Sequence, residues 1–260
     1  MSLTDDAIES IKQMIIDGRL NPGDRLPKEQ ELAESLGLSR GSLREAVRAL
    51  TAMKVLVTRQ GDGTYVTSLT PSVLIGVSNF IVDFHGGASL LDFFHVRRIL
   101  EAEAAAKSSL RLTTEQLEEL GEMVDEAEQL ASAPQVDHES MIKNDQRFHA
   151  LITRSGGNPV LAAIAESMSG ATVRARTWRG ITEDDAALRT VREHRELLEA
   201  LRQRDPERAR LRAAVHVCSV EDWLRRHLEE ISTQTDGSSA ATSGSHWMRD
   251  EQDFVVGSRS

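Results

Sequence analysis

The sequence contains one cysteine, few aromatic residues and no long hydrophobic run. Only 4% of its 260 residues are aromatic, so its cores must be built mainly from aliphatic side chains. The single cysteine, Cys218, excludes a disulfide framework and suits a reducing cytosol. No run of about eighteen apolar residues occurs, and the start of the chain, MSLTDDAIES, is acidic. We therefore expect a cytoplasmic protein with no membrane span and no signal peptide.

The chain has a formal net charge of −10, yet one short segment is basic. From Ser39 to Gln60 the only acidic residue is Glu45, and the basic residues are Arg40, Arg44, Arg48, Lys54 and Arg59. A chain of this net charge does not coat nucleic acid nonspecifically. We therefore expect DNA binding to be confined to this segment and to weaken quickly with salt.

The segment that follows Ser39 has the pattern of a helix with one apolar and one basic face. Ser39 is a good N-cap because its hydroxyl can accept a hydrogen bond from a backbone N–H of the first turn. The apolar residues recur at helical spacing: Leu43, Val47 and Leu50. The arginines recur every four residues on a second face: Arg40, Arg44 and Arg48. A lone arginine stripe is usually only a solvated face, so the neighbouring segments have to support a role in DNA binding.

The preceding segment completes a helix-turn-helix. The pattern at 29–36 predicts a short helix that ends at Gly37, a residue with the conformational freedom that a left-handed C-cap needs. Only residues 37–39 separate this helix from the next one. A turn of that length between two helices is typical of the helix-turn-helix.

The following segment predicts a small β-hairpin. Val55 and Val57 alternate with Leu56 and Thr58, and a second run of β-forming residues follows at 64–67. Between the two runs lies the sequence Gly-Asp-Gly, and Asp-Gly is a favoured hairpin turn. A helix-turn-helix with an adjacent hairpin is a winged helix.

These elements resemble the winged helix-turn-helix of the GntR family. The matching motifs are a first helix at 8–16, GDRLPKEQELAESLGLSR at 23–40, LREAVRAL at 43–50 and RQGDGTYV at 59–66. The resemblance implies that the second helix of the motif and the wing contact operator DNA, through Ser39, Arg40, Gly41, Ser42, Arg44, Arg48, Gln60 and Gly61. Many members carry an arginine in place of Gln30, so the operator sequence does not follow. Since one winged helix makes few base contacts, we expect a homodimer on a two-fold symmetric double-stranded operator.

Beyond the hairpin the sequence predicts only helices. The candidate helices are Pro71–Phe84, Ser89–Leu110, Thr114–Ala131, His138–Ser155, Pro159–Arg179, Asp184–Arg204 and Pro206–Ser232. We therefore expect a mainly α fold with a winged helix-turn-helix domain at 1–67, a linker at 68–71 and an all-α helical bundle at 72–232. Residues 233–260 are rich in Ser, Thr, Gly and Ala, which bury too little apolar surface to order a segment. We expect a disordered tail there.

Four residues of the predicted bundle form a candidate metal-ligand set. Asp145 and His149 are four residues apart and project from one face of a helix. His194 and His216 recur at helical spacing with aliphatic residues, so we expect the three histidines on apolar faces, where an unpaired polar group is costly. A carboxylate with imidazoles suits Zn, Ni, Mn or Fe. The alternative is that each histidine is a core residue bonded to a backbone carbonyl.

Residues 71–230 resemble the FCD effector domain of the FadR-type branch of GntR regulators. The matching motifs are VRRILEAEAAAKSS at 96–109, the Asp-x-x-x-His of NDQRFHALITRSGGNPVL, EHRELLEALRQRDPERAR, and His216. The resemblance implies that Asp145, His149, His194 and His216 hold a divalent metal and leave coordination positions for an effector carboxylate or water. It also implies that Arg97 faces the effector, the alternative being a structural pair with Glu101. Arg174 and Arg176 are not distinguished from ordinary surface arginines.

Three functions compete. The first is a regulator that binds its operator as a homodimer and responds to a small carboxylate metabolite. The second is a metal-dependent enzyme with an appended DNA-binding module, because an open metal site can activate water. The third is an architectural dimer with purely structural histidines. No further acid or base, nucleophile elbow or phosphate loop is recognisable, so we predict a regulator, most simply a repressor, and not an enzyme.

Overall fold

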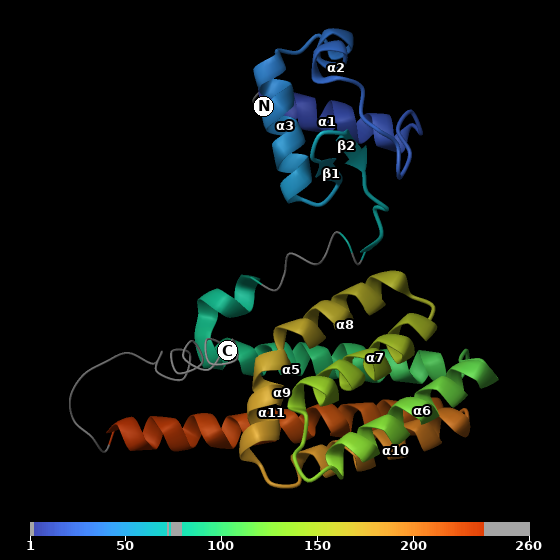
Figure 1. The fold of residues 1–260 in the computed structure, drawn as a ribbon, viewed down its shortest axis with the longest axis vertical. Helices are drawn as coiled ribbons and strands as arrows, with labels where there is room; N and C mark the ends of the chain where they lie inside the picture. Colours follow the sequence, from blue (N-terminus) through green and yellow to red (C-terminus); the bar gives the residue numbers. More distant parts are fainter. Residues whose placement is uncertain (1–2, 72, 74–79, 237–260) are drawn as a thin grey trace. The chain divides into compact units, whose positions relative to one another are not determined.

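A computed structural model of the chain describes residues 3–71, 73 and 80–236, with the backbone alone for 80–89 and 231–236. The chain divides into two compact units, Met1–Val77 and Ser78–Ser260 (Figure 1). Among the described residues, the first unit combines helices with a small two-stranded sheet, and the second contains helices and no strand. The expected mainly α fold, with a hairpin beside the N-terminal helices, is therefore confirmed.

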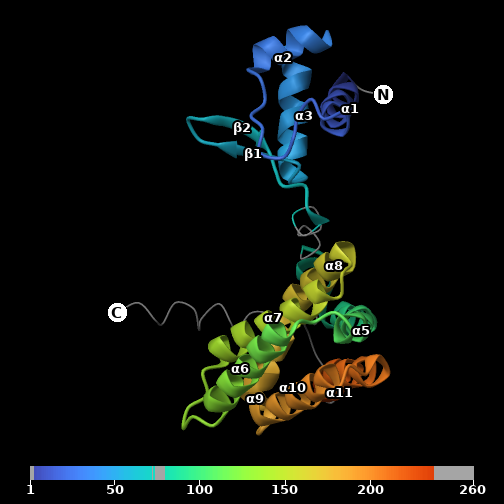
Figure 2. The ribbon, with the colours of Figure 1, turned by 90° about the vertical axis from the view of Figure 1, so that its right-hand side faces the viewer.

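The N-terminal unit is a winged helix. Its helices are α1 (Leu3–Ile16), α2 (Glu29–Leu36) and α3 (Arg40–Ala52), and its strands are β1 (Leu56–Arg59) and β2 (Gly63–Val66). The first helix therefore starts earlier than the sequence motif indicates. The helices surround one aliphatic core, while the hairpin extends to one side of α3 (Figure 2).

Two predicted local signals fix the helix-turn-helix. Gly37 adopts a left-handed conformation, with φ at 67°, and ends α2. The Ser39 hydroxyl accepts a hydrogen bond of 3.0 Å from the backbone N–H of Ser42 and caps α3. In the hairpin, Leu56 lies opposite Val66 and is buried, whereas Val57 is 41% exposed. The core-facing side of β1 is thus the one that carries Leu56 and not the one that carries Val57, whereas Val55, just before the strand, is partly buried against the core.

The C-terminal unit is an all-α bundle. Its helices are α5 (Phe80–Ser109), α6 (Thr114–Ala131), α7 (His138–Ser155), α8 (Pro159–Ala171), α9 (Val173–Thr182), α10 (Ala186–Arg202) and α11 (Pro206–Asp236). The longest helices, α5 and α11, pack along each other, and α10 packs against both α6 and α11. Helix α7 contacts α5, α6, α8 and α9, so it lies in the middle of the bundle (Figure 2).

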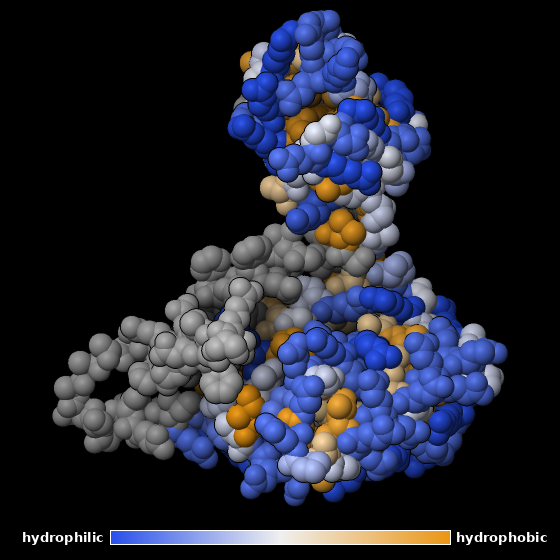
Figure 3. Space-filling view, viewed as in Figure 1, coloured by the Kyte–Doolittle hydropathy of each residue, from blue (hydrophilic) through white to orange (hydrophobic). Residues whose placement is uncertain are grey.

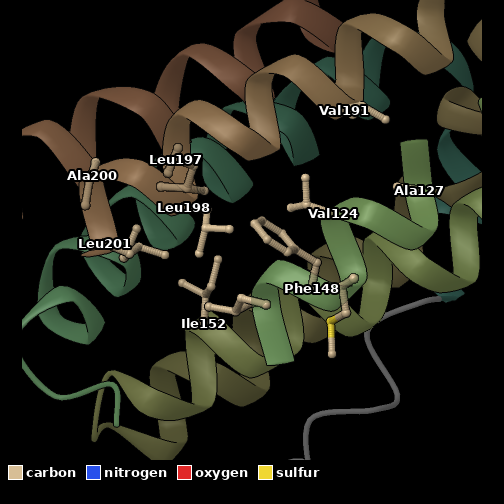
Figure 4. Packing of buried hydrophobic residues seen from close by; sticks show 14 of the residues in the cluster. Val124, Ala127, Phe148, Ile152, Val191, Leu197, Leu198, Ala200 and Leu201 are labelled. Atoms are coloured by element: carbon tan, nitrogen blue, oxygen red, sulfur yellow. The ribbon is translucent and has the colours of Figure 1, made fainter. Parts of the chain in front are cut away.

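The main core lies between α6, α7 and α10. Phe148 points from α7 toward Val124 of α6 and Leu197 and Leu198 of α10 (Figure 4). A second hydrophobic cluster joins α5, α9 and α11. Its buried residues are Leu90, Phe94, Ala175, Val217, Val220, Trp223 and Leu224. On the face seen in Figure 3 hydrophilic side chains predominate, and apolar residues form small separate patches. In the part of the chain that is described, no helix is long and apolar enough to cross a membrane.

Three helix predictions need correction. Helix α5 runs without a break through Gly86-Gly87, which lie in the gap between the predicted helices Pro71–Phe84 and Ser89–Leu110. Glycine lowers helix propensity by only about 1 kcal/mol, and packing can override that cost. The expected helix Pro159–Arg179 is two helices, separated at Thr172. Helix α11 continues to Asp236, past the expected start of the tail. Residues 237–260 and most of the expected helix Pro71–Phe84 before residue 80 lie outside the described residues.

Candidate metal centre and nucleic-acid interface

The four predicted metal ligands come together in the middle of the helical bundle. Asp145 and His149 lie one turn apart on α7, His194 lies on α10 and His216 on α11. All four are buried, with exposed fractions of 5% or less. Each offers one ligand atom, and these four atoms lie within 4.8 Å of one another.

The three imidazoles point the same ring nitrogen toward one carboxylate oxygen. Asp145 Oδ1 lies 3.6 Å from Nε2 of His149, 3.5 Å from Nε2 of His194 and 3.9 Å from Nε2 of His216. Ligands at about 2.1 Å from a common tetrahedral ion lie about 3.4 Å apart. The separations in the cluster are close to this value, so the set can hold a divalent ion with little rearrangement.

Two glutamates orient the imidazoles from behind. Nδ1 of His149 lies 2.8 Å from Oε2 of Glu101, and Nδ1 of His216 lies 2.8 Å from Oε2 of Glu193. A carboxylate at Nδ1 keeps the proton on that nitrogen and leaves Nε2 free to bind a cation. From the sequence, Glu101 is a candidate partner of Arg97 only, and Glu193 belongs to no recognised motif although it directly precedes His194.

His194 is the member of the cluster whose surroundings best fit a metal ligand. Its ring stacks on Phe148 at 4.2 Å between centroids, and neither ring nitrogen has a hydrogen-bond partner among the described residues. Buried polar atoms without a partner are rare in native proteins. The alternative interpretation, a core histidine bonded to a backbone carbonyl, therefore fails for His194. A cation among the four ligands would use the lone pair of its Nε2.

Burial opposes charge on every member of the cluster, and charged neighbours outweigh it at some members but not at others. For Asp145, the charges of Arg176 and His149 outweigh burial and hold the pKa of the carboxyl well below its ordinary value. For His149, Glu101 and Asp145 outweigh burial and raise the pKa to about 9. Burial dominates for His194 and lowers its pKa to about 4. His194 is therefore neutral at physiological pH, whereas His149 must lose a proton before it can bind a metal.

Arg176 is a site residue that sequence analysis missed. It is buried on α9 and forms an ion pair and hydrogen bond with Oδ2 of Asp145. Its second terminal nitrogen donates to the backbone oxygen and the hydroxyl of Ser169, at 2.7 and 3.2 Å. The break between α8 and α9 at Thr172 separates the two helices that carry these partners. No local signal reveals Arg176, because its carboxylate partner lies thirty-one residues away in the sequence.

Arg97 is also buried but is already paired. Its Nε donates to Oε1 of Glu101 at 2.5 Å, and Nη1 donates to the hydroxyl of Thr172 at 3.2 Å. Its side chain is 1% exposed. The pair with Glu101, which the sequence left open, is thus present, and the role of Arg97 in effector binding stays a prediction.

Two pockets reach the cluster from different sides. The first lies between α7, α9, α10 and α11, and its lining includes Asp145, Arg176 and His216. The second lies between α5, α6, α7 and α8, and its lining includes Glu101 and His149. Arg97 lines neither of these two pockets. A small molecule can therefore approach the cluster past an arginine on one side or past a glutamate on the other.

The predicted DNA-binding residues lie at the start of α3 and at the tip of the wing. Ser39, Arg40, Gly41, Arg44 and Arg48 are exposed, and Ser42 is partly buried under its hydrogen bond with the cap. Their exposure leaves the guanidinium groups accessible to a phosphate or a base edge. Gln60 and Gly61 are exposed at the turn of the hairpin.

Exposed ion pairs hold two of these arginines in place. Arg44 pairs with Glu29 of α2 at 3.2 Å, and Arg48 pairs with Glu45 at 2.8 Å. Such exposed pairs contribute little stability and can open for a nucleic-acid ligand. In the wing, Arg59 lies over the ring of Tyr65, 4.3 Å from its centroid. Sequence analysis counted Arg59 in the basic segment but did not place it in the candidate DNA contacts.

Comparisons with known proteins agree with both units. The model of bacterial regulatory proteins of the gntR family matches residues 3–66, and the FCD domain model matches residues 92–219. The galactonate operon transcriptional repressor of Escherichia coli is 27% identical over 238 residues, which cover 89% of this chain and 99% of that protein. The uncharacterized HTH-type transcriptional regulator YcbG of Bacillus subtilis is 27% identical over 230 residues, which cover 88% and 93% of the two chains.

A solved structure supports the same assignment. The GntR protein of Streptococcus agalactiae superposes with a TM-score of 0.59 at 25% identity, over 84% of this chain and 99% of that one. The relatives are transcriptional regulators, so the prediction that the chain is not an enzyme is confirmed. Its buried aspartate and three histidines form a group that could hold a metal ion. With a winged helix at its N-terminus and an FCD domain after it, the chain belongs to the GntR family of bacterial transcriptional regulators.

Proposed function

We propose that the chain is a repressor whose affinity for operator DNA is controlled by a small organic acid bound at a divalent-metal site. The observation that carries the proposal is the convergence of three buried Nε2 atoms on Asp145, with His194 lacking any other partner. Four of the relatives are named as repressors, one of the galactonate operon and three called NanR. These names support repression as the sign of regulation.

The metal ligands in this proposal are Asp145, His149, His194 and His216. Such a set of nitrogen and oxygen donors suits Zn, Ni, Mn or Fe, and four protein ligands leave positions open for a larger coordination number. A bound ion supplies positive charge that attracts an oxygen ligand. Glu101 and Glu193 hold the imidazoles in the tautomer that the ion requires.

The charges around the cluster favour an acid as the effector. In the ion-free protein the guanidinium groups of Arg97 and Arg176 are balanced by the carboxylates of Glu101 and Asp145. A divalent cation adds two positive charges, and Glu193, beside His216, offsets one of them. Burying an unbalanced charge is costly. A carboxylate ligand removes the remaining imbalance, whereas a neutral or cationic ligand does not.

DNA binding in this proposal uses the exposed start of α3 and the wing. Arg40, Arg44 and Arg48 contact bases and phosphates, with Ser39, Gly41 and Ser42 close to the DNA backbone and Gln60 and Gly61 in the wing. We propose that two chains bind a two-fold symmetric operator, because two recognition helices about one helical turn apart reach successive major grooves. The domain boundary that we predict at 68–71 separates this domain from the metal-binding one.

Metal analysis of the full chain tests the proposal. Protein stripped with a chelator, incubated with Zn, Ni or Mn and dialysed should retain about one ion per chain, and His216→Ala should retain none. The variant should still bind operator DNA, because His216 lies in the helical unit. If the wild type retains no ion, or if His216→Ala retains as much as the wild type, the metal site that we propose is wrong. An architectural dimer without an effector would then be the better explanation.

A further inference from the structure

Arg176 combines three properties that the other arginine of the cluster, Arg97, does not combine. It is buried, it is paired with a candidate metal ligand, and it lines a pocket that leads to the cluster. Its Nε has no hydrogen-bond partner among the described residues. A buried guanidinium with an unused donor is costly unless a ligand accepts from it. We infer that Arg176 receives the carboxylate of the organic acid, an inference that rests on the function proposed above.

The pairing with Asp145 places this guanidinium beside the metal ligands. Asp145 directs Oδ1 toward the three imidazoles and Oδ2 toward Arg176. Ser169 holds the other end of the guanidinium through its backbone oxygen and its hydroxyl. Arg176 is thus fixed at the metal-binding side of the pocket before any acid arrives. Since its terminal nitrogens already donate to Asp145 and Ser169, Nε is the donor left for the carboxylate, and a hydrogen bond between two charged groups is a strong one.

The second arginine of the cluster, Arg97, is harder for an acid to reach. It lines neither pocket, its Nε and Nη1 donate to Glu101 and Thr172, and only its Nη2 lacks a partner among the described residues. Its side chain is 1% exposed. An acid would have to break the buried pair with Glu101 and open the bundle to reach it. Arg176 is paired as well, with Asp145, but it already lines a pocket that leads to the cluster.

The charges that line the two pockets also favour the pocket with Arg176 as the site for the acid. In the pocket between α5, α6, α7 and α8 the buried charged group beside His149 is Glu101, a carboxylate that repels an acid. The cations in its lining are already paired with glutamates: Lys143 with Glu139, Arg147 with Glu126 and Arg154 with Glu166. In the pocket between α7, α9, α10 and α11 the acid meets Arg176 and Arg179, which are also paired, with Asp145 and Glu183, but which are buried and therefore less screened by solvent. It also meets Thr177, whose hydroxyl donates to a backbone oxygen and can still accept a hydrogen bond.

The test uses thermal unfolding of the full chain loaded with Zn, with glycolate and galactonate as carboxylate probes. At least one of the two should raise the unfolding temperature of the loaded wild type. Arg176→Gln should weaken the affinity for the acid by about tenfold to a hundredfold, the amount expected from losing a hydrogen bond to a charged group. Arg176→Lys, which keeps the charge but not the Nε donor, should fall in between. Arg174→Gln, an exposed position on the same helix, should respond like the wild type.

Arg176→Gln should strengthen the effect of metal while it weakens the effect of the acid. Without its guanidinium partner Asp145 keeps His149 as a charged neighbour and gains more from a bound cation, so Zn should raise the unfolding temperature of Arg176→Gln by more than that of the wild type. This readout does not involve the acid. If Arg176→Gln binds Zn but keeps the full acid response, our inference is wrong while the metal site stands. If the wild type binds no Zn, the proposed function itself fails.

A pair of pocket-filling variants covers the case in which Arg176→Gln does not fold. Thr190→Leu places a larger side chain in the pocket that contains Arg176, and Gln146→Leu makes a similar change in the other pocket. Both positions are partly buried on helices. Thr190→Leu should lose the acid response and Gln146→Leu should keep it. The reverse result, or no response of the loaded wild type to either acid, would overturn the inference.

Discussion

The substitution His194→Leu should change the stability of the protein in opposite directions with and without metal. In the ion-free protein the imidazole is 1% exposed and neither nitrogen has a partner among the described residues. An unsatisfied buried polar group costs about 1–3 kcal/mol. Leucine carries no polar atom and can pack on Phe148, which stacks on the ring of His194. In a chelator the variant should therefore be as stable as the wild type, or more stable by up to that amount.

In the presence of metal the wild type should be more stable than His194→Leu. An ion at about one hundred times its Kd stabilises the wild type by about 2.7 kcal/mol. For a unit of this size that corresponds to a rise in Tm of about 5–10 °C. His194→Leu should show almost none of this rise, whereas His95→Leu, an exposed control, should show all of it. Thermal melts followed by circular dichroism in chelator and in ZnCl₂ measure both effects. If His194→Leu were less stable than the wild type in chelator and still stabilised by Zn, our account of the orphaned imidazole would be refuted.

Three further predictions follow from the DNA interface and the charges of the site. Arg44→Ala should weaken operator binding, because an arginine bonded to guanine contributes about 1–3 kcal/mol of base discrimination, and it should leave the helical unit folded; unchanged affinity in a gel-shift titration would remove Arg44 from the interface. Light scattering at micromolar concentration should give a homodimer, and a monomer that footprints a palindrome tightly would contradict this. Metal uptake at pH 7.5 should release a proton, because His149, with its pKa raised to about 9, is protonated in the ion-free protein and must be neutral to bind. Metal affinity should accordingly fall as the pH is lowered, and calorimetry that shows neither proton release nor this fall would contradict the assignment of His149.

The predictable parts of this fold are those that depend on neighbours in sequence. The boundaries of α6 and α7 agree with the predicted ones because local side chains cap them: Thr113 forms a capping box with Gln116, and Asp137 accepts from the N–H of Ser140. Ser39 acts in the same way at the start of α3. Such signals involve residues three positions apart, so the sequence alone is sufficient to find them.

The missed features depend on contacts between distant helices. The break at Thr172 coincides with a hydrogen bond from Arg97, a residue on α5, and with the hydroxyl of Thr172 bonding the carbonyls of its own turn. Arg176 looks like a surface residue in the sequence because its partner Asp145 lies on another helix. Glu101 could be assigned to Arg97 by spacing, but its contact with His149 required the packing of α5 on α7. Charge pairs between distant helices produce no periodic pattern in the sequence from which they could be predicted.

Operator binding measured with and without metal and acid tests the central claim most directly. We would use a labelled duplex that the protein itself selects from a random pool, and the acid that gives the largest thermal shift with Zn-loaded protein. Our account predicts that this acid weakens operator binding of the loaded wild type by roughly tenfold, within the usual range of allosteric coupling. It also predicts no effect of the acid on metal-free protein or on His216→Ala. If metal-free protein and His216→Ala respond to the acid as the loaded wild type does, the metal site does not control DNA binding.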